Sequence, residues 1–137
     1  MKEHTTNYSN TFILVADDSN ATVGSIPPLK GGKHTVAGLH FEMIANHPYE
    51  FTSDDVIFTV FAQRKELADS EWIDARNEFF SKGQPSFRAS PLTKKYGWGI
   101  HYNADGKMAL FSVDSIEYRQ FEVDAHLEKV KAMKSKK

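Results

Sequence analysis

The sequence predicts an α+β fold in which a small, mostly antiparallel sheet packs against helices. Residues 11–16 form a short apolar run between polar turn formers, which is typical of a buried strand. Residues 98–102 and 108–113 flank an Asp-Gly turn and indicate a β-hairpin. Between these strands, residues 35–46, 53–67 and 70–81 carry the spacing or the boundary signals of helices. We therefore expect a single domain over residues 1–137.

Composition excludes several classes of protein. Cysteine is absent from the 137 residues, so disulfides, thiolate metal sites and cysteine nucleophiles are excluded. The formal net charge of −1 gives no whole-molecule attraction to nucleic acid or to an anionic membrane. No apolar run reaches the roughly 20 residues that span a bilayer, and the N-terminus lacks the apolar core of a secretory signal. We expect a soluble, cytoplasmic protein with no membrane partner.

The first predicted helix, residues 35–46, has one apolar stripe. Val36, Leu39 and Met43 recur at spacings of three and four, and Ile44 lies beside them. The His47-Pro48 pair ends the helix, because the residue before a proline is disfavoured in helical conformation.

The second helix, residues 53–67, begins at a capping box. Thr52 is followed three residues later by Asp55, in place of the more usual Glu or Gln. We interpret Asp54 and Asp55 as complements to the helix dipole rather than as a catalytic pair of carboxylates. Val56, Ile57 and Val60 favour a helix by their spacing, although their β-branched side chains also suit a strand.

The remaining elements follow from local signals. Residues 70–81 predict a helix that buries its aromatic and aliphatic side chains, and the period of two in the hairpin places His101 on the face opposite Ile100. Residues 115–120 suggest a helical turn, and residues 125–133 predict a last helix. The side chains expected to be buried are Trp72, Ile73, Phe79 and Phe80 in the third helix, and Trp98, Ile100 and Tyr102 in the hairpin.

A basic loop, residues 82–107, is the strongest candidate for a site. It contains five lysine and arginine residues and one aspartate, and its prolines and glycines interrupt any regular pattern up to residue 99. Lysine and arginine side chains form charge-assisted hydrogen bonds with phosphate or carboxylate groups. We predict a binding module for a small anionic or phosphorylated ligand. Its candidate residues are Lys33, Arg88, Ser90, Lys94, Lys95 and Lys107 for charge and hydrogen bonds, and Tyr96 or Trp98 for a stacking surface.

The Gly31-Gly32-Lys33 turn before the first helix resembles part of a phosphate-binding loop. The full pattern is not met, because Pro27 occupies the first glycine position and His34 occupies the hydroxyl position. This mismatch argues against a nucleotide triphosphatase. A structural turn is the simpler interpretation, with Lys33 adding a cation near the loop.

Two alternatives from other classes stay open. An enzyme could use His101 as general acid or base beside the anion site. A protein-interaction module could instead use the loop as a docking surface without a small ligand. Nucleic acid is a less favoured partner, because Trp98 and Tyr102 share the expected core face. The sequence indicates no cofactor and no metal site, and it assigns no oligomeric state.

Several strings of residues resemble a family of small soluble bacterial and fungal proteins that is described only as a domain of unknown function. The resemblance covers nearly the whole chain and implies a single-domain protein without an assigned activity. It rests on His4-Thr5-Thr6-Asn7-Tyr8 with Asn10-Thr11-Phe12, on Pro27-Pro28-Leu29-Lys30-Gly31-Gly32-Lys33, on residues 49–55, and on residues 80–85, 90–94 and 96–99.

Overall fold

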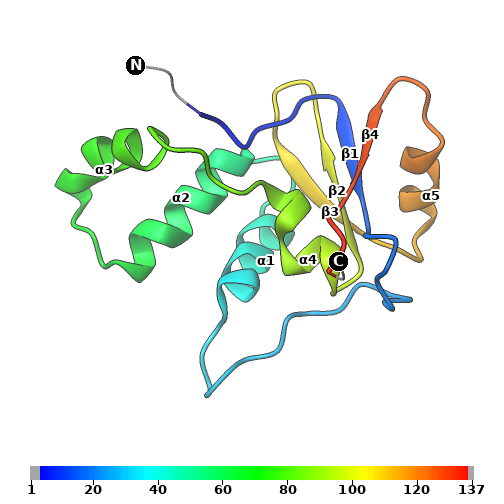
Figure 1. Ribbon diagram of the computed structural model, residues 1–137, viewed down its shortest axis with the longest axis horizontal. Coiled ribbons are helices and arrows are strands. Elements are labelled where there is room, and N and C mark those ends of the chain that lie inside the picture. Colours follow the sequence, from blue (N-terminus) through cyan, green and yellow to red (C-terminus); the bar gives the residue numbers. More distant parts are fainter. Residues whose placement is uncertain (1–3, 136–137) are drawn as a thin grey trace.

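A four-stranded mixed sheet organises the protein. The computed structural model describes residues 4–135 and confirms the α+β class. The strands are β1 (Thr11–Leu14), β2 (Trp98–Tyr102), β3 (Met108–Ser112) and β4 (Glu128–Lys131), in the order β3-β2-β1-β4 (Figure 1). β1 pairs antiparallel with β2 and parallel with β4, whereas β2 and β3 form the predicted antiparallel hairpin.

β1 is buried on both faces because the sheet separates two layers of side chains. Ile13 faces the larger core, together with Ile100 of β2. Phe12 and Leu14 face the opposite side, where they pack with Tyr118. This alternation follows from the period of two along a strand, and it explains why the sequence of β1 is continuously apolar rather than alternating.

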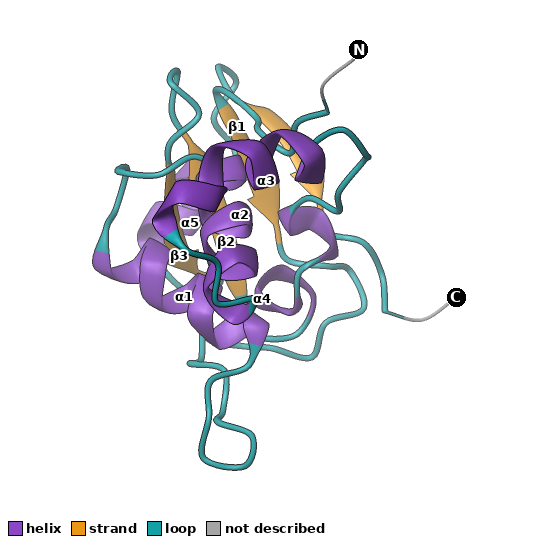
Figure 2. Cartoon of the chain, turned by 90° about the vertical axis from the view of Figure 1, so that its left-hand side faces the viewer, coloured by secondary structure: helices purple, strands orange, loops and turns teal. Residues whose placement is uncertain are grey.

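Most helices lie on one side of the sheet. These are α1 (Val36–Asn46), α2 (Ser53–Arg64), α3 (Trp72–Phe79) and α4 (Pro91–Lys94), and Figure 2 shows them from the helical side with the strands behind. Phe41 and Ile44 of α1 and Val56 of α2 enter the larger core. α3 packs on α2 around a separate aromatic cluster that includes Phe58 and Phe80. Short 3₁₀ turns, Asp69–Glu71 and Phe87–Ala89, precede α3 and α4.

The opposite face of the sheet is covered by one helix. This is α5 (Ile116–Glu122), which packs there through Tyr118 and Phe121, as Figure 1 shows to the right of the sheet. The predicted helical turn at residues 115–120 is therefore the start of a helix that completes a second, smaller core. Ser115 begins α5, because its side chain accepts a hydrogen bond from Tyr118 N at 3.0 Å.

The predicted helix at residues 125–133 is wrong, because this segment contains β4. Glu128 N donates to Asn10 O at 3.0 Å, and Ala132 N donates to Leu14 O at 2.9 Å. The residues of this segment favour a helix by their local propensity. In the folded protein, however, the edge of β1 provides hydrogen-bond partners for the backbone of the segment. Burial of Ala132 in the larger core adds to this pairing, so tertiary contacts outweigh local propensity.

Two predicted buried faces differ in detail from the structure. In α1 the buried residues are Ala37, Gly38, Phe41 and Ile44, so the core stripe is rotated from the predicted one. In α3 the side chain of Ile73 is 76 % exposed. α3 lies at the outside of the molecule and contacts α2 and the preceding 3₁₀ turn, so only one of its sides is covered. No helix within residues 4–135 is long and apolar enough to cross a membrane.

The N-terminal segment, residues 4–8, is fastened to the start of α2 by Asp54. The buried carboxylate of Asp54 accepts hydrogen bonds from Thr6 N and Thr6 Oγ1, each at 2.7 Å, and from Thr5 Oγ1 at 2.8 Å. Asp55 forms the predicted capping box with Thr52. The two neighbouring carboxylates thus have different structural roles: the sequence predicted the capping box of Asp55 but not the hydrogen bonds of Asp54 to the N-terminal segment.

Candidate functional site

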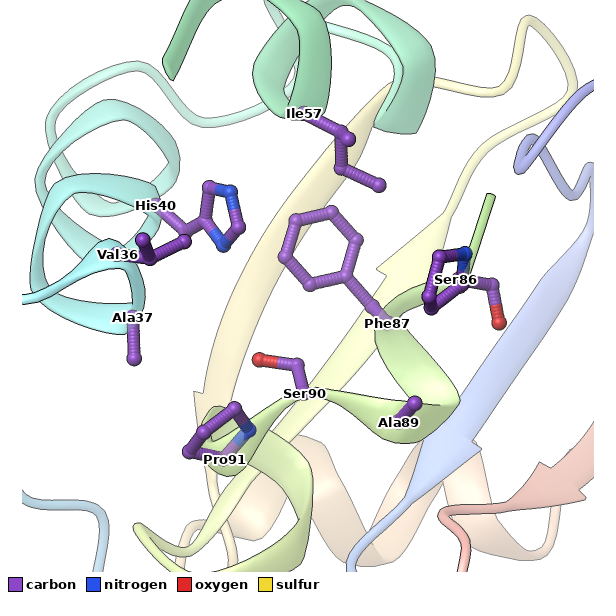
Figure 3. A pocket seen from close by; sticks show the side chains of 10 residues that line it. Val36, Ala37, His40, Ile57, Ser86, Phe87, Ala89, Ser90 and Pro91 are labelled. Carbon is purple, nitrogen blue, oxygen red and sulfur yellow. The ribbon is translucent and has the colours of Figure 1, made fainter. Parts of the chain in front are cut away.

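An apolar pocket of about 290 Å³ lies between α1, α2 and residues 85–91. Figure 3 shows the side chains of His40, Ile57 and Phe87 pointing toward one another around it. Its volume is close to the lower end of the range of about 300–1,000 Å³ that is typical of small-molecule sites. The lining residues are Val36, Ala37 and His40 from α1, Ile57 from α2, and Pro85, Ser86, Phe87, Ala89, Ser90 and Pro91 from the third wall.

Helix capping determines which side chains of α1 line the pocket. The hydroxyl of Thr35 accepts a hydrogen bond from Gly38 N at 3.1 Å and so begins the helix. Val36 and His40 are then separated by four residues and lie on the same side of α1. The capping box at Thr52 fixes the start of α2 in the same way and brings Ile57 to the pocket from the other helix.

Two serine caps shape the third wall. Ser86 Oγ accepts a hydrogen bond from Arg88 N at 3.3 Å, and Ser90 Oγ accepts one from Leu92 N at 3.1 Å. Thr93 Oγ1 also donates to Phe87 O at 2.7 Å, which ties α4 back to the preceding turn. Phe87 is only 1 % exposed. The segment that the sequence predicted as a long loop is therefore folded and held by its own hydrogen bonds.

His40 is the polar group of this pocket that the sequence did not identify. Its imidazole lies edge to face against the ring of Phe87, with centroids 5.1 Å apart. Burial lowers the pKa of His40 to about 4, so the ring is neutral at pH 7. Within residues 4–135 no group forms a hydrogen bond with either ring nitrogen. The available signal was a histidine four residues after Val36, on the pocket side of an amphipathic helix.

The structure distributes the predicted cations over separate regions. Lys33 lies in an exposed turn, where its backbone forms two hydrogen bonds with Lys30, within the segment between β1 and α1 that projects from the molecule in Figure 1. Arg88 Nε donates to the backbone oxygen of Lys131 at 2.8 Å. Lys107 lies at the start of β3, opposite Thr52. These three cations have different neighbours.

Lys94 and Lys95 do lie together. They line a hollow of about 680 Å³ with residues 18–23, Ser25 and Ser135. Lys95 Nζ is 5.9 Å from the centroid of the Tyr96 ring, which makes a cation–π contact. This hollow also contains Asp18, an acid that offsets part of the positive charge.

Trp98 and Ser90 are placed by packing and capping. The indole Nε1 of Trp98 donates to Ser25 O at 2.8 Å, and its ring lies 5.4 Å from that of Phe41. Gly24 packs so closely against this indole that an added Cβ would lie 2.8 Å from it. Ser90 lines the apolar pocket rather than the hollow of Lys94 and Lys95.

His101 lies on the second face of the sheet, as the hairpin register predicted. Its Nδ1 is 2.8 Å from the hydroxyl oxygen of Tyr49, and its ring stacks on Phe121 with centroids 4.2 Å apart. Burial lowers the pKa of His101, and the charge of Asp124 opposes that shift. The hydrogen bond and the stacking fix the ring in one orientation. No group of three or more potential metal ligands occurs in residues 4–135.

Comparison with known proteins agrees with the resemblance that the sequence motifs suggested. No curated protein and no solved structure matches the chain. The model of a family described as a family of unknown function, DUF6157, matches residues 3–137. The match covers the strands, the helices and the pocket described above. The chain belongs to this family.

Proposed function

We propose that the protein binds a small, mostly apolar molecule in the pocket between α1, α2 and residues 85–91. The observation that carries this proposal is the imidazole of His40, which is neutral, faces an apolar cavity and has no hydrogen-bond partner in residues 4–135. His40 is partly exposed, so its ring nitrogens are accessible from the pocket. A ligand with a hydrogen-bonding group can use one of them as its partner.

The chemistry of the pocket defines the ligand further. A neutral imidazole offers one donor and one acceptor, so it suits a hydroxyl, amide or carbonyl group. Most of the remaining wall consists of aliphatic and aromatic carbon, including Ile57, Phe87 and Pro91. Convergence of a few polar groups, here His40 with the hydroxyls of Ser86 and Ser90, on a mostly apolar wall is the usual composition of small-molecule sites.

A pair of alkylbenzenes tests the proposal by thermal shift and calorimetric titration. We expect 4-propylphenol to bind saturably and to raise the melting temperature, because a ligand that binds only the folded state stabilises it. Propylbenzene, which lacks the hydroxyl, should bind about two- to tenfold more weakly, as expected for loss of one hydrogen bond. His40→Phe should remove this difference.

Matched variants locate the binding. Ala89→Phe places a ring into the pocket wall and should abolish binding, whereas Ala104→Phe makes the same change in the exposed turn of the hairpin and should leave binding intact. Equal binding by both variants would contradict the proposed location. Absence of binding by both compounds and by larger phenols would contradict the function.

The hollow of Lys94 and Lys95 supports a second candidate, the anionic ligand that the basic sequence indicated. Two neighbouring lysines can bind a phosphate group, and such binding weakens as salt screens the charges. The probe is inorganic phosphate, titrated at low and moderate salt. The Lys94→Gln/Lys95→Gln double variant should lose any binding, and unchanged affinity would exclude this hollow.

Two further hypotheses stay predictions. If the protein is an enzyme that uses His101 for proton transfer, His101→Gln should abolish turnover and leave the fold intact. If it is instead a protein-interaction module, it should form a stable complex with a partner and show no shift of melting temperature with small molecules.

A further inference from the structure

A second hollow of about 160 Å³ adjoins the pocket. It shares Val36, His40 and Ile57 with the pocket, so the two spaces adjoin along the same side chains. We call the two together the α1–α2 groove. The second hollow is otherwise lined by Val60, Phe61, Arg64 and Phe79.

Arg64 is the one permanent cation among the residues that line the groove, and no acidic side chain lines it. Arg64 lies in the last turn of α2 and is exposed. Within residues 4–135 its guanidinium has no ion pair and no side-chain hydrogen bond. Arg76 of the neighbouring helix differs, because its Nη2 binds Asp55 Oδ1 at 3.0 Å and its guanidinium lies over the Phe80 ring.

We infer that the groove selects an amphipathic monocarboxylate, whose apolar body occupies the pocket and whose carboxylate binds Arg64. This inference rests on the proposed function, since it specifies the ligand class of the same site. The planar guanidinium matches a carboxylate with two parallel hydrogen bonds. Because Arg64 is exposed, the carboxylate stays partly hydrated, and the large desolvation cost of a buried ion pair does not arise.

His40 lines both hollows, so a hydroxyl or carbonyl group on the body of such a ligand would meet its imidazole between Phe87 and Arg64. The neutral ring adds no second positive charge at the middle of the groove, so the attraction for an anion is concentrated at the end that Arg64 borders. The ligand is thereby oriented: its apolar end points toward Phe87 and its charged end points toward solvent.

Three eight-carbon probes of different charge test this orientation. The full chain is titrated calorimetrically with octanoate, octan-1-ol and octylamine at low salt. We expect octanoate to bind about two- to fivefold more tightly than octan-1-ol, which is the effect of one exposed ion pair, and octylamine to bind most weakly. Moderate salt should reduce the advantage of octanoate.

Arg64→Gln should remove the advantage of octanoate and leave the affinity for octan-1-ol unchanged. The matched control is Arg119→Gln, which removes an exposed arginine from α5 on the other face of the sheet and should keep the advantage. Binding is the correct measure here, because loss of a cation at a helix C-terminus also changes stability by about 0.3–1 kcal/mol.

The outcomes separate this inference from the function on which it rests. Equal affinities of octanoate and octan-1-ol, or an advantage that persists in Arg64→Gln, would overturn the carboxylate inference and leave the pocket as a binding site. Binding of all three probes that survives Ala89→Phe would place them outside the pocket and overturn both. No binding of any of the three probes would overturn the carboxylate inference, and the titration with 4-propylphenol would then decide whether the pocket binds a ligand.

Discussion

His40 shows how a single side chain can connect stability with pH. Its ring is held among apolar groups, and burial lowers its pKa to about 4, whereas histidine in an unfolded chain titrates near 6.5. Between these pH values the unfolded state binds more protons than the folded state. The free energy of unfolding therefore falls as the pH drops through this window, and the full contribution of neutral His40 is present above about pH 6.5.

The prediction for His40 concerns the loss of stability between pH 7 and pH 4.5. From the two pKa values we expect the ring to account for about 2 kcal/mol of that loss. Between pH 7 and pH 4.5 the free energy of unfolding should therefore fall by about 2 kcal/mol less in His40→Phe than in the unmodified protein. Urea unfolding at both pH values measures the difference. His126→Phe, at an exposed position, should keep the original sensitivity. Equal acid sensitivity of His40→Phe and the unmodified protein would show that the ring is hydrated.

Individual residues also explain why the basic segment did not become a single cluster. The Ser86 and Ser90 caps turn the chain twice within a few residues, so that Phe87 enters the core while Arg88 reaches β4. Lys94 lies at the end of the short helix that follows and faces another hollow. Sequence order gives the local charge, but the direction of each side chain depends on turns whose geometry is decided by tertiary contacts.

At the scale of elements, strands and helices with strong local signals were predictable. The apolar run of β1, the Asp-Gly hairpin and the Thr52 capping box each depend on neighbours within a few residues, and all three occur in the structure. β4 was not predictable in this way, because its strand conformation depends on pairing with a segment at the opposite end of the sequence.

The same distinction applies to the candidate site. The segment that the sequence singled out, residues 82–107, contains the third wall of the pocket, including Ser90, but the sequence predicted an anion site there and not an apolar pocket. It did not locate His40, because burial of that ring arises only when α1, α2 and Phe87 come together.

β4 leads to a prediction about the backbone of Ala132. This residue is buried, and its N–H donates to Leu14 O at 2.9 Å. Ala132→Pro removes that donor and should lower the free energy of unfolding by about 1–3 kcal/mol, the cost of leaving the oxygen of Leu14 without its partner. Lys134→Pro is the control, because Lys134 is exposed and lies after the paired segment. Equal urea midpoints for both variants would show that the pairing of β4 contributes little.

For the whole molecule, Asp54 connects the N-terminal segment with the helical layer. It is 9 % exposed, and three donors from Thr5 and Thr6 surround its carboxylate. The segment continues to Tyr8, whose hydroxyl lies 3.2 Å from Ser86 Oγ in the wall of the pocket. Asp54 therefore helps to hold the N-terminal segment against the start of α2, and Tyr8 extends this contact to the pocket wall at Ser86.

Asp54→Asn tests this connection with a minimal change of shape. We expect the free energy of unfolding to fall by about 1–2 kcal/mol, because charge-assisted hydrogen bonds become neutral and one acceptor becomes a donor. Asp105→Asn makes the same change in the exposed hairpin turn and should have little effect. Urea unfolding of the two variants measures the difference. Equal stability of Asp54→Asn and Asp105→Asn would contradict the conclusion that the Asp54 carboxylate holds the N-terminal segment in place.

The central place of β1 has a consequence for synthesis in the cell. This strand lies between β2 and β4, and both of its partners are translated long after it, β4 almost at the end of the chain. Ribosomes add about 5–20 residues per second, so the most apolar strand waits for a time on the order of ten seconds before its second neighbour exists. During translation, Phe12, Ile13 and Leu14 are therefore an unpaired nascent segment, and their protection from aggregation depends on chaperones or on provisional contacts rather than on the finished sheet.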